Sequence, residues 1–430
     1  MTERLPASVP TLVIGAGVHG LSTAWHLARA GERVLVLDKT DVAAGASGIA
    51  CGIVRNNYYQ PAMQELMAAC VEVWESEAQA LHYHPAGYIA LGPAAQEGDL
   101  AEVFARHQRI GYPSELYVGE DEVAGHMRSL YDDWRAPGLS VCLHEQAGGY
   151  AFNRESMLGL ADLARGAGAQ IETGIEVTGF CTDGAGAVQR VSTSAGEIAV
   201  DQVVVAVGPW IASLWAMLGL PDRLDVRQPD GRVVPDQPMW TYWYLQEGEV
   251  DFAPGIFVTN DGHSSPVLHV DSDQPLHADD GELITSEPWG VYFKPDRDSV
   301  QGGAQPLKLG HTFTVDPYPT GTVDDEFPGL WSASLSHCLK RFEGARGRYR
   351  QARSGGVGAF TVDNFPVFDH MRPNVFVAAD SNHGYKMIAV GREIARVLGG
   401  EHSSLLHPFR YERFASGDLH PVSHSPYPWS

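Results

Sequence analysis

Residues 11–38 read TLVIGAGVHGLSTAWHLARAGERVLVLD, in which an apolar run enters a glycine turn, a helical stretch follows, and a second apolar run ends on an acid. This order is the strand–turn–helix–strand fingerprint of a dinucleotide-binding unit. Gly15 permits the tight turn, Gly17 lets the backbone approach a pyrophosphate, and Gly20 lets the helix pack closely on the sheet. Asp38 stands where its carboxylate can accept hydrogen bonds from the hydroxyls of an adenosine ribose. The fingerprint predicts that the chain binds an adenine dinucleotide.

Composition limits the other classes of partner. The chain has 430 residues, of which 44% are hydrophobic and 19% charged, and its formal net charge is −23. Such a charge argues against nucleic acid or an anionic membrane surface as a partner, and no apolar run is long enough to span a membrane. The five cysteines are scattered without CxxC spacing, so we predict neither a disulfide framework nor a metal site. We expect a cytoplasmic protein.

Three later segments favour FAD over NAD. Small residues at 45–48 follow the ribose acid and can let a loop run along the pyrophosphate and ribityl chain of a long cofactor. Strand–glycine–helix junctions then recur in VVVAVGPWIASLW at 203–215 and in VFVAADSNHGYKMIAVG at 375–391. The second junction predicts a helix N-terminus facing the flavin, where negative charge develops on reduction. An enzyme that binds only a nicotinamide dinucleotide would not need its dinucleotide-binding domain to resume at both of these junctions.

Periodicity predicts the remaining elements. Alternating runs at 238–245, 290–294 and 299–303 indicate an antiparallel sheet that could form one wall of a substrate site. Amphipathic or capped stretches predict helices at 61–80, 99–107, 120–130, 149–167, 335–352 and 383–398.

These segments resemble the FAD-dependent amine and amino acid oxidases of the D-amino acid oxidase superfamily, among them the sarcosine oxidases and glycine oxidase. The resemblance covers nearly the whole chain. It is carried by GAGVHG with Asp38, GIVRNNYY at 52–59, VVVAVGPW at 203–210, TVDNFPVFD at 361–369 and NHGYK at 382–386.

The resemblance implies an α/β fold, α+β overall, in which a discontinuous Rossmann-type FAD-binding domain accepts an inserted, mostly antiparallel β-sheet substrate domain. We expect the FAD-binding domain at 9–85, 146–222 and 350–414, the substrate domain at 86–145 and 223–349, and an extended tail at 415–430. The residues expected to contact FAD are Gly15, Gly17, Val18, His19, Gly20, Asp38, Lys39, Ser47, Val177, Gly208, Trp210, His383, Gly384 and Tyr385.

Two departures from the family bear on the attachment of the flavin. Gly356 stands where monomeric sarcosine oxidase has its flavin-linking cysteine, and Ile49 stands about where dimethylglycine dehydrogenase-like relatives have a linking histidine. We therefore expect non-covalent FAD, with Cys51 a remote candidate for linkage and more simply a packed thiol. Gly358 replaces an active-site tyrosine of the family, which suggests a roomier or different substrate pocket.

By the same resemblance the chain oxidises the C–N bond of a secondary amine or amino acid, sarcosine-like, N-methyl or cyclic. Hydride passes to flavin N5, and O2 is the expected acceptor, giving H2O2. Arg55 and Lys386 would hold the substrate carboxylate, although each could equally be a surface or pyrophosphate cation. PLKLGHT at 306–312 nominates Lys308 for oxygen reduction, whereas a competing alignment places VQGG there and leaves no base. Tyr242 and Tyr244, alternating on one predicted strand, could line the pocket or pack in the sheet.

Two other functions remain open from the sequence. One is an FAD-dependent dehydrogenase of amines or 2-hydroxy acids that uses a different electron acceptor. The other is a flavin-holding subunit of a larger complex. The sequence leaves the exact substrate and the oligomeric state undecided.

Overall fold

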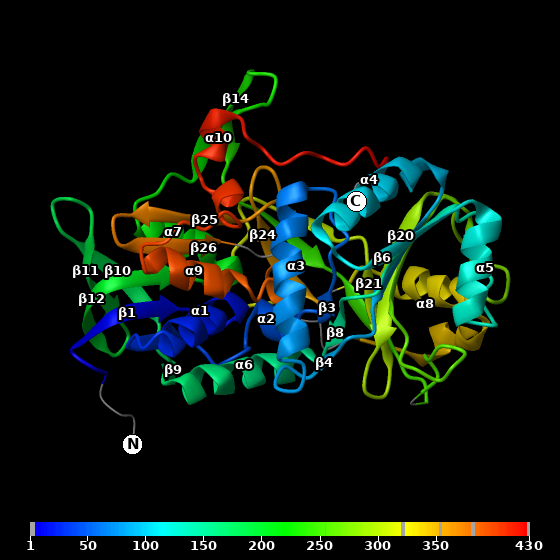
Figure 1. Ribbon diagram of the computed structural model, residues 1–430, viewed down its shortest axis with the longest axis horizontal. Helices are drawn as coiled ribbons and strands as arrows, with labels where there is room; N and C mark the ends of the chain where they lie inside the picture. Colours follow the sequence, from blue (N-terminus) through cyan, green and yellow to red (C-terminus); the bar gives the residue numbers. More distant parts are fainter. Residues whose placement is uncertain (1–4, 254, 320–322, 352–354, 380–382, 428–430) are drawn as a thin grey trace.

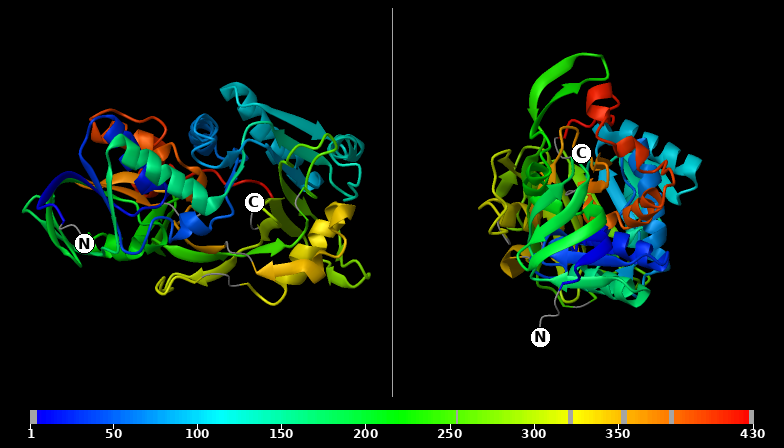
Figure 2. Two further views of the ribbon diagram at one scale, coloured as in Figure 1. Left: turned by 90° about the horizontal axis from the view of Figure 1, so that it is seen from below. Right: turned by 90° about the vertical axis from the view of Figure 1, so that its left-hand side faces the viewer.

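Two eight-stranded sheets form the two ends of the molecule (Figure 1; Figure 2). The computed structural model describes residues 5–253, 255–319, 323–351, 355–379 and 383–427, and every statement below concerns those residues. Asn382 of the predicted NHGYK motif lies outside them.

The first sheet carries the fingerprint. Its path runs β10–β11–β12–β1–β2–β9, with β26 beside β12 and β25 beside β26. The neighbours β9, β2, β1, β12 and β26 run parallel, as expected for strands joined by helical crossovers. The bounds are β1 (Ser8–Ile14), β2 (Val34–Asp38), β9 (Gln170–Thr173), β10 (Val177–Thr182), β11 (Val188–Thr193), β12 (Gly196–Val205), β25 (Val367–Arg372) and β26 (Val375–Ala379).

Helices cover one face of this sheet. The α1 helix packs between α6 and α9, and α3 stands in the middle of the molecule between these helices and the second sheet (Figure 1). A Cβ added at Gly391 would lie 2.3 Å from the backbone of Ser22, so α9 approaches α1 this closely because position 391 has no side chain. These helices are α1 (Val18–Arg29), α3 (Pro61–Ser76), α6 (Asn153–Ala167) and α9 (Val390–Leu398).

The opposite face of the first sheet packs on α7 and a small three-stranded sheet, β22–β15–β24. The hairpin β13–β14 projects beyond this face beside α10 (Figure 1). The bounds are α7 (Ile211–Met217), α10 (Arg413–Ser416), β13 (Arg223–Arg227), β14 (Val233–Pro238), β15 (Thr241–Leu245), β22 (Leu307–Gly310) and β24 (Gly356–Phe360).

The second large sheet runs β23–β16–β21–β20–β17–β5–β7–β6 and is antiparallel except for the pair β17–β5. One face packs its apolar side chains on α8, with Phe293 and Trp331 fully buried at the contact. The bounds are β5 (Tyr88–Gly92), β6 (Ser114–Val118), β7 (Val141–Glu145), β16 (Glu247–Val250), β17 (Val267–Ser272), β20 (Trp289–Pro295), β21 (Val300–Ala304), β23 (Tyr349–Gln351) and α8 (Phe327–Cys338).

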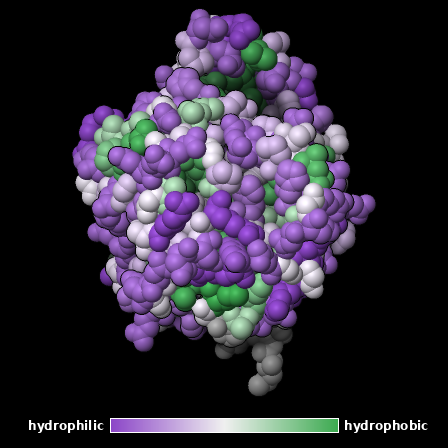
Figure 3. Space-filling view, turned by 90° about the vertical axis from the view of Figure 1, so that its right-hand side faces the viewer, coloured by the Kyte–Doolittle hydropathy of each residue, from purple (hydrophilic) through white to green (hydrophobic). Residues whose placement is uncertain are grey.

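Smaller elements complete the fold. The sheet β3–β8–β4 pairs the segment after the fingerprint with the strand that precedes α6. The bounds of the remaining elements are β3 (Ile53–Val54), β4 (Tyr83–His84), β8 (Gly149–Ala151), β18 (Leu276–His277), β19 (Leu283–Thr285), α2 (Ala46–Ile49), α4 (Glu97–Ile110) and α5 (Glu120–Leu130). Within the described ranges, no helix combines the length and apolar character that crossing a membrane requires. The face seen in Figure 3 is mostly hydrophilic, with small separated apolar patches.

The predicted α/β class with a mixed set of sheets is confirmed, but two predicted helices are wrong. The helix predicted at 335–352 is instead the end of α8, two 3-10 turns and β23, because the backbone becomes extended at Leu339 and left-handed at Gly344. The helix predicted at 383–398 is a 3-10 turn, Gly384–Lys386, followed by α9. Residues 387–389 between them are fully buried, so they serve as an apolar linker and not as one face of a continuous helix.

After α10, residues 417–427 form an irregular segment that crosses the surface (Figure 1). The imidazole Nδ1 of His424 lies 2.9 Å from Oδ1 of Asp99 on α4, and the backbone N–H of His424 donates to the same carboxylate. The amide of Gln60 donates to the Pro421 carbonyl at 2.9 Å. The described part of the tail is therefore tied to the start of α3 and to α4.

Candidate cofactor and substrate site

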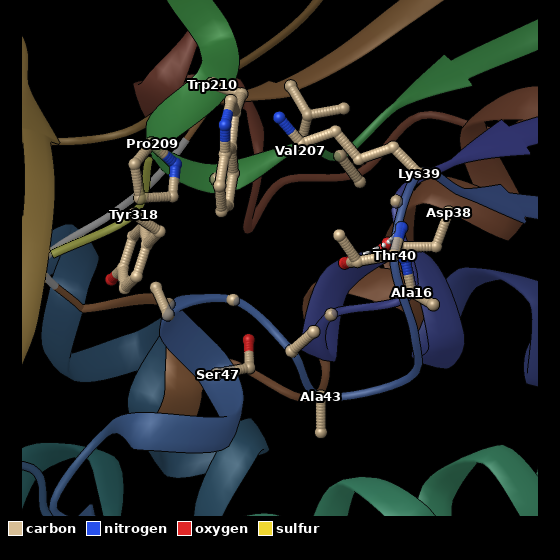
Figure 4. A pocket seen from close by; sticks show the side chains of 18 of the residues that line it. Ala16, Asp38, Lys39, Thr40, Ala43, Ser47, Val207, Pro209, Trp210 and Tyr318 are labelled. Atoms are coloured by element: carbon tan, nitrogen blue, oxygen red, sulfur yellow. Dashed lines mark hydrogen bonds between the residues drawn. The ribbon is translucent and has the colours of Figure 1, made fainter. Parts of the chain in front are cut away.

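A large cavity opens at the carboxyl ends of β1, β2 and β12, where open α/β sheets bind their ligands. It encloses about 1390 Å³ not filled by protein atoms, part of it open to solvent. Its lining continues from the fingerprint turn through the loop at 43–50 to Glu247, Gly356 and Tyr385. Figure 4 shows the end nearest the fingerprint.

The glycine turn brings the N-terminus of α1 to this cavity. Gly15 has a positive φ of 106°, and a Cβ there would lie 2.3 Å from the Ala206 carbonyl oxygen. Gly17 is the N-cap and has no side chain to cap the helix, while the Val18 N–H donates to Oγ of Ser47 at 3.1 Å. Because the first N–H groups of a helix lack partners within the helix, this end fits an anionic pyrophosphate.

Asp38 lies beside the turn. Its Oδ2 accepts the Ala16 N–H at 2.9 Å and its Oδ1 accepts the Thr40 N–H at 2.9 Å. Oδ1 also accepts the Thr40 hydroxyl at 3.1 Å, so Oδ2 is the oxygen that keeps a lone pair for a hydrogen bond from a ribose hydroxyl. The backbone bonds fix the carboxylate in place for that contact.

A segment far from the fingerprint in the sequence, which includes Tyr318, lies across this end of the cavity (Figure 4). Nζ of Lys39 lies 2.7 Å from the Asp316 carboxylate and 4.6 Å from the Trp210 ring centroid. The Trp210 indole N–H donates to Asp316 at 2.8 Å, and its ring stacks on Tyr318 at 5.1 Å. We call residues 316–318 the strap.

Most of the predicted cofactor contacts meet at the cavity. Gly20 and His383 are not among its lining residues. A Cβ at Gly20 would lie 1.9 Å from the Gly15 carbonyl oxygen, so this glycine serves helix packing. His383 is buried, with Nδ1 3.1 Å from the Tyr58 hydroxyl. The predicted residues that line the cavity are Gly15, Gly17, Val18, His19, Asp38, Lys39, Ser47, Val177, Gly208, Trp210, Gly384 and Tyr385.

The two positions that the family resemblance associates with covalent linkage come together beside Tyr318 of the strap. A Cβ at Gly356 would lie 2.4 Å from Cδ1 of Ile49 and 2.5 Å from the Tyr318 hydroxyl. Cys51 is buried nearby, and burial, reinforced by the charge of Glu247, raises the pKa of its thiol well above the ordinary range. A thiol that stays protonated is a poor nucleophile for flavin attachment.

Arg55 and Lys386 approach the same aromatic ring. The Arg55 guanidinium carbon lies 4.8 Å from the Tyr58 ring centroid, and Nζ of Lys386 lies 5.8 Å from that centroid. Arg55 also lies over Tyr88, at 5.4 Å. Arg55 follows β3 and Lys386 ends the 3-10 turn after β26, so the fold gathers two cations from distant segments. Neither cation is among the residues that line the cavity, although Tyr385, the neighbour of Lys386, is; the two cations beside Tyr58 are a candidate place for a carboxylate.

The structure does not bring the other nominated residues to this place. Lys308 is exposed on β22, with Nζ 5.5 Å from the Trp243 ring centroid, and it does not line the cavity. Tyr242 and Tyr244 are buried in the apolar core beneath the first sheet, where the Tyr242 hydroxyl donates to the Pro209 carbonyl at 3.2 Å. Their alternation reflects sheet packing.

Several residues of the site were not nominated from the sequence. Asp316 and Tyr318 of the strap lie in an irregular, proline-rich segment that has no recognisable motif. Glu247 also lines the cavity, and strand pairing, which no local pattern reveals, brings it to Tyr292 on a separate strand.

Comparisons with known proteins give one consistent family. The family model described as FAD dependent oxidoreductase matches residues 11–397. Monomeric sarcosine oxidase of Bacillus sp. is 25% identical over 402 residues, covering 87% of this chain and 88% of that protein. Human peroxisomal sarcosine oxidase is 25% identical over 214 residues, and this match spans 49% of the chain and 53% of the human protein. The crystal structure of L-proline dehydrogenase from P. horikoshii superposes with a TM-score of 0.76 at 18% identity, covering 96% of this chain and 100% of that one, a likeness of fold alone.

Proposed function

The chain belongs to the FAD-dependent oxidoreductase family, and from this premise we propose that it oxidises the C–N bond of a secondary amine or amino acid. The proposed substrate class is a sarcosine-like N-methyl or cyclic amino acid. When bound, FAD supplies the ring that accepts a hydride equivalent from the substrate α-carbon. The observation that carries the proposal is the meeting of Arg55 and Lys386 around Tyr58.

The residues of the cavity fit FAD held without a covalent bond. The N-terminus of α1 faces the place of the pyrophosphate, and Asp38 faces the place of the ribose. Position 356 has no side chain with which to form a link, and the Cys51 thiol is kept protonated by burial.

Arg55 and Lys386 are proposed to bind the carboxylate of the substrate. A chain with a net charge of −23 does not attract anions at long range, so a carboxylate site has to be built from local cations. A planar guanidinium can bind a carboxylate through two parallel hydrogen bonds, and an ammonium adds a compact charge beside it. This arrangement selects amino acids over simple amines.

The electron acceptor has two candidates. We propose O2, giving H2O2, by analogy with the relatives named as oxidases. A dehydrogenase that uses another acceptor is the second candidate. It is favoured by the exposed position of Lys308, which is the cation nominated for oxygen reduction and does not line the cavity.

Anaerobic mixing of the yellow holoprotein with a panel of substrates tests the function. We expect N-methyl or cyclic amino acids to bleach the flavin absorbance and to yield an aldehyde or imine-derived product. Bleaching by 2-hydroxy acids, with none by any amine or amino acid, would overturn the C–N assignment. Admitting air afterwards separates the two acceptors, because an oxidase regains its colour with release of H2O2 and a dehydrogenase needs an added dye.

A further inference from the structure

A buried carboxyl group supports the loop that carries Arg55. This loop, residues 55–58, follows β3 and includes Tyr58, the ring that both candidate cations approach. Oε2 of Glu145 on β7 accepts the Asn56 N–H at 2.7 Å. Glu145 is 0% exposed, and a carboxyl buried this deeply is stable only with specific partners. The backbone next to Arg55 is one of those partners.

Two more buried side chains hold the same loop. Nε2 of His107 on α4 lies 3.0 Å from the Asn56 carbonyl oxygen, and the Gln64 amide on α3 donates to the Tyr58 carbonyl at 2.7 Å. His107 and Gln64 are 0% and 1% exposed. Polar side chains from β7, α4 and α3 therefore fix the backbone of the loop, and with it the point from which the Arg55 side chain extends.

Glu145 and Arg55 interact electrostatically. Burial raises the pKa of Glu145 from 4.5 to about 7, while the hydrogen bonds from the loop and from the Tyr112 hydroxyl, and the positive charge of Arg55, lower it. The ionised carboxylate in turn offsets part of the charge that Arg55 can offer to a ligand. A carboxylate bound beside Arg55 would place a second negative charge in this region, which favours the protonated form of Glu145.

The other buried titratable groups around Glu145 keep one protonation state near neutral pH. Burial lowers the pKa of His107 to about 4, and it lowers the pKa of His144, the neighbour of Glu145 on β7, to about 4. Burial raises the pKa of the neighbouring tyrosines far above neutrality. The groups that surround Glu145 from other elements are Arg55 after β3, Tyr83 on β4, Tyr88 on β5, His107 on α4 and Tyr112 before β6, with the exposed Glu75 of α3 beyond Tyr83 and Tyr112.

We propose that Glu145 is a positioning residue of the carboxylate site and takes up a proton when a carboxylate binds beside Arg55. This inference rests on the proposed function and adds a pH dependence to it. Below the pKa of Glu145 the proton is already present, so affinity for a carboxylate is highest there. Affinity then falls as the pH rises through about 7, because binding must draw a proton from solution.

Methoxyacetate tests the proposal. It has the shape of sarcosine with an ether oxygen in place of the nitrogen, and its one titratable group is a carboxyl that stays ionised above about pH 5. Calorimetric titration of the holoprotein should show affinity falling by about 10-fold from pH 6 to pH 8.5. Titrations at pH 8.5 in two buffers of different ionisation enthalpy should show uptake of at most about one proton.

E145Q carries a neutral side chain that can still accept the Asn56 N–H. We expect it to bind methoxyacetate equally well at pH 6 and pH 8.5, and at pH 8.5 about 10-fold more tightly than the wild-type protein. Misfolding cannot produce such a gain. The matched control is E393Q, which removes a buried carboxylate on α9 and should keep the wild-type pH profile.

A second variant shifts the pH dependence without removing the carboxyl group. Y112F deletes a hydroxyl that donates to the ionised form of Glu145, so the pKa of Glu145 rises and the fall in affinity should move to higher pH. Y131F removes a buried hydroxyl that is bonded to Ser265, and it should leave the profile unchanged. Flavin content per chain reports that each variant is folded.

A pH-independent affinity in the wild-type protein, or an undiminished fall in E145Q, would overturn the role of Glu145. If Arg55→Met weakens methoxyacetate binding in that case, the carboxylate site of the proposed function stands. Binding that survives Arg55→Met, or no binding by the wild-type protein, would overturn the carboxylate site and this inference together. Flavin bleaching by amines would still test the C–N chemistry by itself.

Discussion

The two large sheets approach the cavity in different ways. In the first sheet, Leu12, Val36 and Val204 are fully buried among apolar side chains, and the contacts for a ligand come from loops beyond the strand ends. In the second sheet, Glu247 lines the cavity from within β16 and accepts a hydrogen bond from the Tyr292 hydroxyl. Backbone N–H groups are already free at strand and helix ends, so binding a ligand there costs little free energy. A carboxylate buried within a strand is stable only when specific partners offset the free energy of burying it.

The comparison separates two kinds of substitution. Changes at the glycine turn should alter how firmly FAD is held, because the turn works through backbone shape. Changes at the two cations beside Tyr58 should alter which small molecule binds while leaving the flavin in place. Each prediction below tests one side of that division, beginning with the largest expected effect.

Gly20→Ala should remove nearly all bound FAD. The added Cβ would lie 1.9 Å from the Gly15 carbonyl oxygen, so α1 would have to move away from β1 and the turn would lose its shape. We expect at least a 100-fold loss of FAD affinity, equivalent to about 3 kcal/mol. Flavin absorbance per chain after gel filtration measures it. Gly125→Ala on α5, where a Cβ meets nothing within 4 Å, is the control and should keep its flavin.

Arg55→Met should affect the substrate and spare the flavin. Removing one of two cations that meet at Tyr58 should weaken the binding of amino acid substrates by about 100-fold, since hydrogen bonds between charged groups contribute about 1.5–3 kcal/mol each. Lys386→Met should act in the same direction. The concentration dependence of anaerobic flavin bleaching measures both effects.

The control for these two variants is Lys340→Met, which removes an exposed cation that does not line the cavity. It should leave substrate affinity and flavin content unchanged. If Arg55→Met and Lys386→Met bind substrate normally, the carboxylate site lies elsewhere. If they instead lose FAD, these two cations hold the cofactor and not the substrate.

Dinucleotide binding at the strand ends of the first sheet could be predicted from the sequence, because it depends on short local motifs. Gly15, Gly17, Asp38 and the recurrent junction at Gly208 each depend on a few consecutive residues, and the structure places them at one cavity. Arg55 and Lys386 were nominated by resemblance to a family, and the structure brings them to the same ring.

The polar contacts within the second sheet could not be predicted from the sequence, because they depend on which strands pair and in which register. Glu247 and Tyr292 meet across Gly303, and nothing near any of the three in the sequence encodes that register. Tyr242 and Tyr244 show what alternation of residue types can and cannot predict. Their alternation correctly indicates a strand, but it does not say which face of the strand meets a ligand. The pattern that predicted them as substrate contacts fits their place in the core equally well.

The buried Glu145 gives the second sheet a dependence on pH. It accepts the Asn56 N–H at 2.7 Å and the Tyr112 hydroxyl at 2.9 Å, and burial raises its pKa from 4.5 to about 7. Folding therefore favours the protonated form. Its contribution is complete below about pH 4.5 and is lost as pH rises through 7, at most about 3 kcal/mol.

Glu145→Gln should abolish that pH dependence. We expect the difference in thermal midpoint between the variant and the wild-type protein to shift in favour of the variant from pH 5 to pH 8. Glu72→Gln, which removes an exposed carboxylate on α3, should show a constant difference over the same range. A constant difference for Glu145→Gln as well would mean that Glu145 stays ionised in the folded protein.

The smallest expected effect concerns the strap. Here the Asp316 side chain contributes to FAD binding at the end of the cavity where backbone groups of the glycine turn are expected to dominate. Asp316→Asn removes the ion pair with Lys39 and keeps an oxygen for the Trp210 indole N–H. Since the Asp316 side chain is 57% exposed, the pair contributes about 0.5–1 kcal/mol, and FAD affinity should fall by about 2- to 5-fold. The loss should shrink in high salt, which screens an exposed pair. Asp162→Asn, which breaks the exposed pair with Arg165 on α6, is the control and should leave FAD affinity unchanged. A loss as large as that of Gly20→Ala would show that side chains of the strap, and not the backbone of the turn, dominate the binding of FAD.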